Sequence, residues 1–309
     1  MLTHLWHLLT RTFDDFGRDR CQSMAAALAY YTAFSLPPLL VLLLLVLGAV
    51  TDPSTIRDAM DGQLQTLMGN KGAEQVSALM QQAQRPEGTG WRTALGILAL
   101  LFGATGVFGE LQGALNRTWR VAPDPKQGGI RNFIGKRLFS FTFVIAIAFL
   151  RLVSLVLSAL ISAFGGIVSN MVNGGLSEAL LFSLDLVLSF AIFTLVFAVT
   201  FRFLPDAKVA WRDVLHGATG TAFLFLIGKF AIGFYLGRSN PGEAYGAAGS
   251  LAVLLVWLYY SSMILLFGAE FTRVYTEDKG HHIEPEKGAI VVPPAPRPGE
   301  PQPGATATE

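Results

Sequence analysis

The chain has few charged residues, a single cysteine and no excess of basic residues. Only 15% of its 309 residues are charged, against roughly a quarter in an ordinary soluble domain, while 52% are hydrophobic. The net charge of +1 provides no overall positive field to bind nucleic acid. Cys21 has no second cysteine to pair with, and there is no thiolate cluster for zinc or iron–sulfur. The composition therefore argues against a soluble enzyme, a nucleic-acid-binding protein and a sulfur-ligated cofactor.

Motifs for soluble catalysis are missing from the sequence. It has no glycine-rich phosphate loop ending in Lys-Ser or Lys-Thr, no His-Glu-x-x-His and no G-x-S-x-G. His281 and His282 have no neighbouring ligand types for a metal site, and no carboxylates cluster as a nuclease would require. We therefore expect no enzymatic activity, no catalytic residue, no metal and no cofactor.

Long apolar stretches are what the sequence has instead. Residues 21–51 contain no Asp, Glu, Lys or Arg, and roughly 20 apolar residues suffice to cross a bilayer core. Further largely apolar stretches lie at 93–115, 138–163, 179–204, 213–236 and 245–271. Buried helices of soluble proteins rarely contain such long apolar runs. The sequence predicts an all-α membrane protein with six transmembrane helices.

Three segments outside the spans complete the predicted architecture. Residues 1–20 separate apolar from charged side chains on a helix, which predicts an interfacial helix. The segment 52–90 has helical periodicity, which predicts amphipathic helices on the outer side of the membrane. Proline, glycine and glutamate dominate the C-terminal segment and predict disorder. The expected domains are a membrane domain at 1–278 and a disordered cytoplasmic tail at 279–309. The apolar face of the N-terminal helix comprises Leu2, Leu5, Trp6, Leu9, Phe13 and Phe16.

The distribution of Lys and Arg among the connections predicts the orientation, since cytoplasmic loops carry the excess of these residues. The N-terminal segment and the connections after the second and fourth spans are rich in them. The connection 164–177 has none, and the connection after the fifth span has only Arg238. Both termini are therefore expected in the cytoplasm.

Ionisable residues inside predicted spans are costly and are therefore candidates for function. At about 1.5 Å of rise per residue, Arg151, Asp185 and Lys229 are expected at similar depths in the outer half of the membrane. Their surplus positive charge favours an anionic ligand. The same three residues are also consistent with an ion pair that only fastens helices together, so the sequence leaves both interpretations open.

A second set of candidates, a possible inner polar site, lies near the cytoplasmic boundary and comprises Glu110, His216 and Glu270. Glu110 lies beside four glycines of the second span, which predicts packing against another helix. The imidazole of His216 suits a proton relay, but such a residue is more often structural. Snorkelling towards the membrane surface is enough to explain Glu270.

Four segments carry a resemblance to a known family. They are MAAALAYYTAFSLPPLL (24–40), FGATGVFGELQGALNRTWRV (102–121), WRDVLHGATGTAFLFLIGKFAIGFYL (211–236) and YGAAGSLAVLLVWLYYSSMILLFGAEFTRVY (245–275). In this order and spacing they resemble the YihY/BrkB family of bacterial inner-membrane proteins over about residues 5–278. The resemblance implies six transmembrane helices, with motif residues at Glu110, Asn116, Trp119, Trp257 and Glu270 among others. The sequence does not support the ribonuclease label once attached to this family.

Two functional hypotheses follow from the resemblance and the intramembrane charges. The resemblance implies links to envelope integrity and to transport, which favours a transporter or flippase-like protein for an anionic lipid or small solute. The alternative is a non-transporting scaffold whose segment 52–90 and tail bind envelope proteins. Expected partners are membrane lipids, and for the scaffold envelope proteins, but not nucleic acid. A cavity that reaches Arg151 or Lys229 would favour the transporter, and sealed ion pairs would favour the scaffold.

Overall fold

The computed structural model describes residues 2–48, 106–125, 175–238 and 249–293, together with isolated residues between 54 and 77. The third predicted span, at 138–163, and most of the segment 52–90 lie outside the described residues. Helix dominates the described part of the chain.

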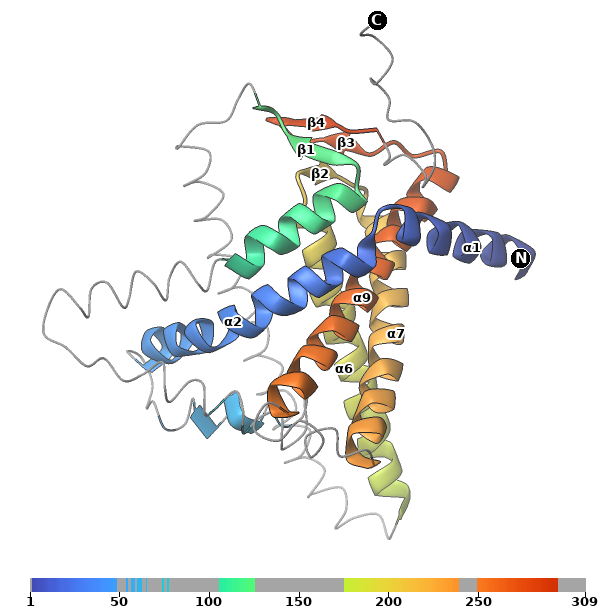
Figure 1. Ribbon diagram of the computed structural model, residues 1–309. Helices are drawn as coiled ribbons and strands as arrows, with labels where there is room; N and C mark the ends of the chain where they lie inside the picture. Colours follow the sequence, from blue (N-terminus) through green and yellow to red (C-terminus); the bar gives the residue numbers. More distant parts are fainter. Residues whose placement is uncertain are drawn as a thin grey trace, which may run out of the picture.

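The labelled helices are α1 (Leu2–Arg18), α2 (Cys21–Gly48), α6 (Gly175–Phe203), α7 (Trp211–Arg238) and α9 (Gly249–Asp278). A further helix covers residues 106–118. Helix α9 is the centre of the packing, since it contacts α1, α2 and α7, while α6 packs on the other side of α7. Figure 1 shows α6 and α7 running side by side, with α1 extending to the right from the upper part of the bundle.

Three helices of the described part are long and apolar enough to cross a membrane. Their apolar stretches are Leu186–Phe203, Trp211–Ala231 and Leu251–Asp278, which coincide with the last three predicted spans. Helix α2 has 28 residues and occupies the first predicted span, and the helix at 106–118 overlaps the end of the second. The positions of these helices therefore agree with the predicted spans, and six spans in total remain a prediction.

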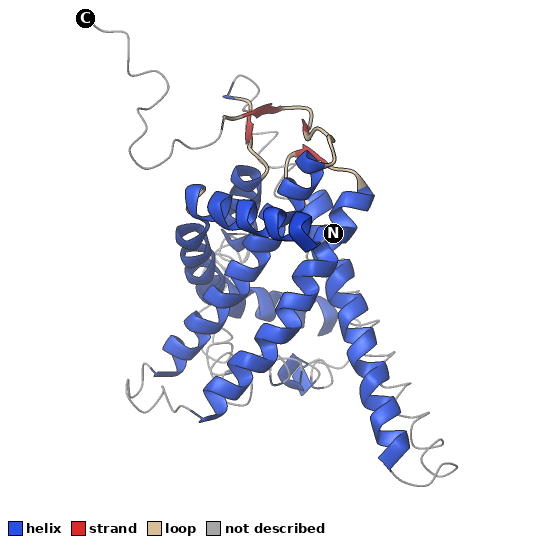
Figure 2. Ribbon diagram, turned by 90° about the vertical axis from the view of Figure 1, so that its right-hand side faces the viewer, coloured by secondary structure: helices blue, strands red, loops and turns tan. Residues whose placement is uncertain are grey.

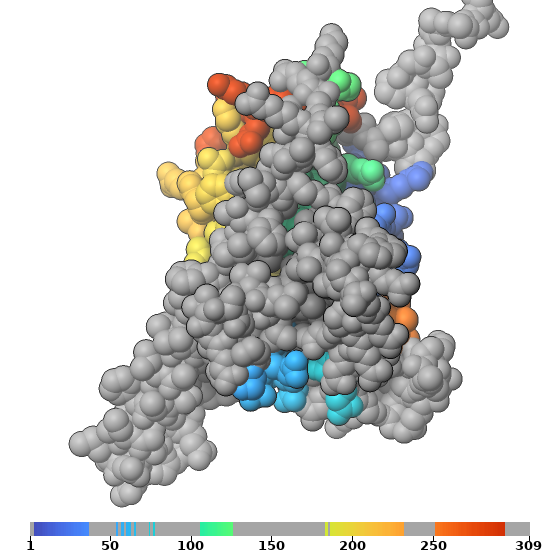
Figure 3. Space-filling model, turned by 90° about the vertical axis from the view of Figure 1, so that its left-hand side faces the viewer, coloured from blue at the N-terminus to red at the C-terminus, as the bar shows by residue number. Residues whose placement is uncertain are grey.

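Short strands join distant parts of the chain at one end of the bundle, which we call the strand end. Strand β1 (Val121–Pro123) pairs antiparallel with β4 (Ala289–Val291), and β2 (Ala207–Lys208) pairs antiparallel with β3 (Glu284–Pro285). Figure 2 shows the strands above the helices, which converge towards them. In the space-filling view of Figure 3 red atoms of the segment that ends at residue 293 lie beside the yellow region at this end.

The strands correct the predicted boundary of the disordered tail, which placed its start at residue 279. Residues 284–291 form β3 and β4, and His281 Nδ1 lies 2.7 Å from Asp213 Oδ2 at the start of α7. Gly288 adopts a φ of +88°, which lets the chain turn between the two strands. The composition predicts disorder because the segment has too little apolar surface to bury. In the structure the segment is held instead by backbone hydrogen bonds to β1 and β2.

Truncating the chain after Lys279 is expected to lower stability, because it leaves the backbone groups of β1 and β2 without their partners. We expect a lower unfolding midpoint and faster proteolysis around residues 121–123. A chain that ends at Pro293 keeps both strands and serves as the control. Equal midpoints for the two truncations would contradict the structural role of this segment.

Helices α7 and α9 approach closely because each contributes a Gly-x-x-x-Thr pair to their contact. The side chain of Thr272 lies against Gly217, and that of Thr221 lies against Gly268, so that a Cβ on either glycine would overlap the opposing threonine. Each hydroxyl donates within its own helix, Thr221 to the Gly217 carbonyl at 2.7 Å and Thr272 to the Gly268 carbonyl at 2.6 Å. The two helices therefore interlock without an unpaired hydroxyl at this contact.

The predicted apolar face of α1 divides between protein contact and exposure. Phe16 is buried and Leu9 half-buried, and the ring of Phe16 lies 5.9 Å from that of Phe267 on α9, while the buried Leu8 lies outside the predicted face. Trp6 and Phe13 remain 69% and 70% exposed. An apolar sector thus stays free to contact lipid, although its place at the membrane surface remains a prediction.

Candidate functional site

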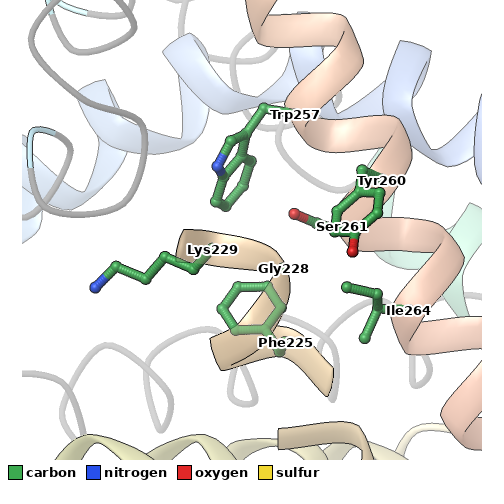
Figure 4. A pocket seen from close by; sticks show the side chains of 7 residues that line it. All are labelled: Phe225, Gly228, Lys229, Trp257, Tyr260, Ser261 and Ile264. Atoms are coloured by element: carbon green, nitrogen blue, oxygen red, sulfur yellow. The ribbon is translucent and has the colours of Figure 1, made fainter. Parts of the chain in front are cut away.

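A narrow crevice lies between α7 and α9 and is bordered by Lys229. Its empty volume is about 180 Å³, with no room for a water-sized sphere between its side chains. Lys229 is half-buried, and in Figure 4 its side chain extends away from α9, while Trp257 and Ser261 lie on the α9 side. The lining residues are Phe225, Gly228, Lys229, Trp257, Tyr260, Ser261 and Ile264.

Gly228 explains why aromatic and hydroxyl groups of α9 meet α7 at this point. A Cβ at Gly228 would overlap Tyr260 and would lie 2.9 Å from Ile264 Cδ1. The glycine therefore lets Tyr260 pack directly on the α7 backbone beside Lys229. The crevice is therefore bordered by Lys229 and by hydroxyl and indole groups of α9 within two predicted spans, with the lysine ammonium directed away from α9.

The structure tests only part of the predicted outer trio. Arg151 lies outside the described residues, and the backbone of Asp185 is part of α6 but its side chain is not described. Lys229 is the one member whose side chain is described, and it borders the crevice. The association of the three residues therefore stays a prediction.

Backbone register places Asp185 and Lys229 on neighbouring helices but not at the same level. Phe225 of α7 contacts Phe193 and Phe197 of α6, with ring centroids 4.8 and 5.7 Å apart. Counted from this level at about 1.5 Å per residue, Lys229 is about 6 Å farther from the strand end and Asp185 about 15 Å. The offset of about 9 Å exceeds the few ångströms expected from counting residues along the spans.

The predicted inner set separates into different environments. Glu270 is completely buried, Glu110 is half-buried, and His216 is exposed. His216 stacks on Tyr275 with a centroid distance of 5.1 Å, and its Nδ1 lies 2.6 Å from the Arg212 carbonyl. Within the described residues, Glu270 forms its hydrogen bonds and ion pairs with residues other than Glu110 and His216. The three candidates therefore do not form a single inner site.

Glu270 instead belongs to a buried ionic network centred on Arg273. The guanidinium of Arg273 donates from Nε and Nη2 to Glu270 Oε2 at 3.1 and 2.8 Å, from Nη2 to Asp15 Oδ2 at 2.6 Å, and from Nη1 to Glu277 Oε1 at 2.8 Å. Arg273 itself is completely buried. All three nitrogens of the guanidinium therefore donate to carboxylates of α9 or α1, and Nη2 makes the bond that ties α9 to α1.

Two further arginines complete this network from other elements. Arg11 of α1 pairs with Glu277, and Arg120, which follows the 106–118 helix, lies 3.7 Å from Asp15 and 3.9 Å from Glu277. The network therefore joins α1, α9 and the end of the 106–118 helix at the strand end. The spacing of Glu270, Arg273 and Glu277 along one helical face signals the pairing within α9, but nothing in the sequence pairs Arg273 with Asp15.

A second polar junction explains one of the motif residues. Asn116 Nδ2 donates to Asp206 Oδ2 at 3.0 Å, and Asn116 Oδ1 accepts from the backbone N–H of Asp206 at 2.8 Å. Gln112 Nε2 donates to the other oxygen of the same carboxylate at 3.1 Å. Both Asn116 and Asp206 are buried, so the junction fastens the 106–118 helix to the turn between α6 and α7.

A family comparison identifies the chain. The family model described as Virulence factor BrkB matches residues 12–290. The chain belongs to the BrkB family. This confirms the resemblance seen in the four sequence segments, and the match continues past residue 278 through β3 and into β4, of which only Val291 lies beyond it.

Curated relatives of this BrkB-family chain are described as UPF0761 membrane proteins. One from Alkalilimnicola ehrlichii is 30% identical over 263 residues, covering 84% of this chain and 56% of the relative. One from Psychrobacter sp. strain PRwf-1 is 25% identical over 279 residues, covering 88% and 49%, and one from Rhodospirillum centenum is 29% identical over 265 residues, covering 85% and 56%. The chain thus spans about half the length of these relatives. No solved structure matches it.

Proposed function

We propose that this BrkB-family membrane protein is a transporter of the bacterial inner membrane that moves an anionic lipid or small anionic solute in support of the cell envelope. The proposal includes six transmembrane helices, an α1 that lies in the membrane interface, and both termini in the cytoplasm, which makes the strand end the cytoplasmic end. It includes no catalytic step, cofactor or nucleic acid, and its partners are membrane lipids.

The crevice beside Lys229 carries this proposal. A lysine inside a predicted span is costly unless it faces protein or water, and such residues mark substrate pathways. Here the crevice reaches that lysine, and Ser261 and Trp257 supply hydrogen-bond donors on its α9 side. Because the crevice has no room for a water-sized sphere, a substrate requires α7 and α9 to separate at this level. That movement is typical of alternating access.

Replacing Lys229 with glutamine is expected to slow transport roughly tenfold or more, since a hydrogen bond to a charged group contributes about 1.5–3 kcal/mol. The measurement follows fluorescent anionic and zwitterionic lipids, and a small organic anion, across liposomes that contain the purified full-length chain. Lys208→Gln is the matched control, because Lys208 is an exposed lysine on β2 at the strand end. Wild-type protein that moves none of these probes would overturn the transporter proposal.

The scaffold alternative is favoured by a different observation, the tight interlocking of α7 and α9 through their Gly and Thr residues. If the scaffold is correct, wild-type liposomes show no movement of lipid or solute. Substitutions at Arg151, Asp185 and Lys229 then lower only the unfolding midpoint. The same experiment therefore separates the two functions.

A further inference from the structure

An arginine without a partner ends helix α6. Arg202 lies in the last turn of this helix and is half-buried, and its Nε is buried without a hydrogen-bond partner. In the part of the chain that the structure describes, no hydrogen bond or ion pair joins the side chain of Arg202 to another residue. Partly removing a guanidinium from water without giving it a partner costs free energy, which a bound anion would recover.

The carboxylates nearest to Arg202 in the chain are bound by other residues. Asp206 is buried, and both of its carboxylate oxygens accept hydrogen bonds from the 106–118 helix. Asp213 is also buried, and its Oδ2 lies 2.7 Å from His281 Nδ1. Within the described residues neither carboxylate pairs with Arg202, so the positive charge of this arginine is available to an external anion.

Two exposed aromatic side chains lie beside this arginine at the turn between α6 and α7. Phe203 follows Arg202 directly, and its ring packs edge to face on that of Trp211 with centroids 5.7 Å apart. Phe203 and Trp211 are 48% and 44% exposed. They lie where the apolar stretch of α6 ends and that of α7 begins, and Arg212, also exposed, follows Trp211. Aromatic and basic side chains at the ends of spans are typical of the membrane–water interface.

We propose that Arg202 binds the phosphate group of an anionic phospholipid at the membrane boundary nearest the strand end. The guanidinium donates hydrogen bonds to the phosphate oxygens, and the rings of Phe203 and Trp211 contact the glycerol and the first carbons of the acyl chains. A lipid is favoured over free phosphate because only the lipid has apolar groups to cover these rings. An anionic headgroup is favoured because Arg212 adds a second positive charge, which would repel the ammonium of a zwitterionic headgroup.

This lipid site is separate from the crevice of the proposed transport. The contact of Phe225 with Phe193 and Phe197 marks a level that α6 and α7 share. At about 1.5 Å per residue, Arg202 lies about 10 Å nearer to the strand end than this level, and Lys229 lies about 6 Å farther from it. About 16 Å along the helix axes therefore separates the two residues. The lipid site consequently does not rest on transport through the crevice.

Lipid binding to the purified full-length chain in detergent tests the site, with native mass spectrometry as the readout. Phosphatidylglycerol and phosphatidylcholine of equal chain length serve as the anionic and zwitterionic probes. We expect wild-type protein to bind phosphatidylglycerol roughly tenfold more tightly, the usual effect of one charge-assisted hydrogen bond. Arg202→Gln is expected to lose this preference. Arg202→Lys should keep part of it, because an ammonium retains the charge but not the paired donors of the guanidinium.

Lys287→Gln is the matched control, because Lys287 is exposed in the turn between β3 and β4 at the strand end, and it should keep the wild-type preference. Arg202→Gln should unfold at the wild-type midpoint without added lipid, since it removes no contact within the described residues. Equal preference for phosphatidylglycerol in Arg202→Gln and wild type, or none in wild type, overturns the proposal. Displacement of the lipid by an equal concentration of inorganic phosphate also overturns it. These results do not depend on the liposome assay.

Discussion

Replacing Arg273 with methionine is expected to destabilise the folded protein by about 3–5 kcal/mol, as breaking a buried ion pair typically does. The side chain of Arg273 is completely buried and satisfies Asp15, Glu270 and Glu277 at once. Methionine has a similar length but no donors, so it leaves the completely buried carboxylate of Glu270 without the arginine that binds it, while Asp15 and Glu277 keep Arg11 and Arg120 nearby. The largest loss should be at the contact between α1 and α9.

Thermal unfolding in detergent, followed by the amount of monodisperse protein, checks this expectation. Arg212→Met is the control, since Arg212 is an exposed arginine in the first turn of α7. Arg273→Lys should recover only part of the loss, because an ammonium cannot donate in the fixed fork that meets three carboxylates. An Arg273→Met midpoint equal to that of the control would show that the network contributes little to stability.

Replacing Gly268 with alanine is expected to destabilise the protein by about 1–3 kcal/mol, the usual cost of overpacking a close contact. A Cβ at this position would overlap the side chain of Thr221 and would lie 2.8 Å from Thr221 Cγ2. Helix α9 would have to move away from α7, which also disturbs the reciprocal contact of Thr272 with Gly217. We expect a lower unfolding midpoint and a larger separation of the two helices.

Gly220→Ala is the control, because Gly220 lies on α7, the helix that Gly268 meets, and a Cβ there meets nothing within 4 Å. Alanine has the higher helix propensity, so this control should stabilise the protein by up to about 1 kcal/mol. Combining Gly268→Ala with Thr221→Gly should recover part of the loss, because it removes the threonine that the new Cβ meets. Additive losses in the double variant would contradict direct contact between the two positions.

The contacts disrupted by Arg273→Met and Gly268→Ala differ in how far the sequence predicts them. The Gly-x-x-x-Thr spacing is visible in the sequence as a close-packing face, but the sequence does not say which glycine meets which threonine. The ionic network is harder still. Glu270 is a candidate from its place in an apolar stretch, yet its environment is set by Cys21 and by Arg273, which also binds Asp15, 258 residues away in the chain.

The crevice shows the same division between sequence and structure. Lys229 stood out because a charge within an apolar run is expensive and therefore conspicuous. Its neighbours Trp257, Tyr260 and Ser261 are ordinary residues of another apolar stretch, and only the packing of α9 on α7 brings them to Lys229. The absence of a side chain at Gly228 matters because Tyr260 packs against it.

The sequence by itself determined that this is a helical membrane protein of the BrkB family and where its described helices lie, because the length of an apolar run and the order of short motifs are local properties. Only the tertiary structure decided that residues 284–285 and 289–291 form strands and that Arg273 joins α1 to α9. Strand pairing and ion pairs depend on which distant backbone and side-chain groups become neighbours. That outcome is set by the packing of whole helices and cannot be read from any one segment.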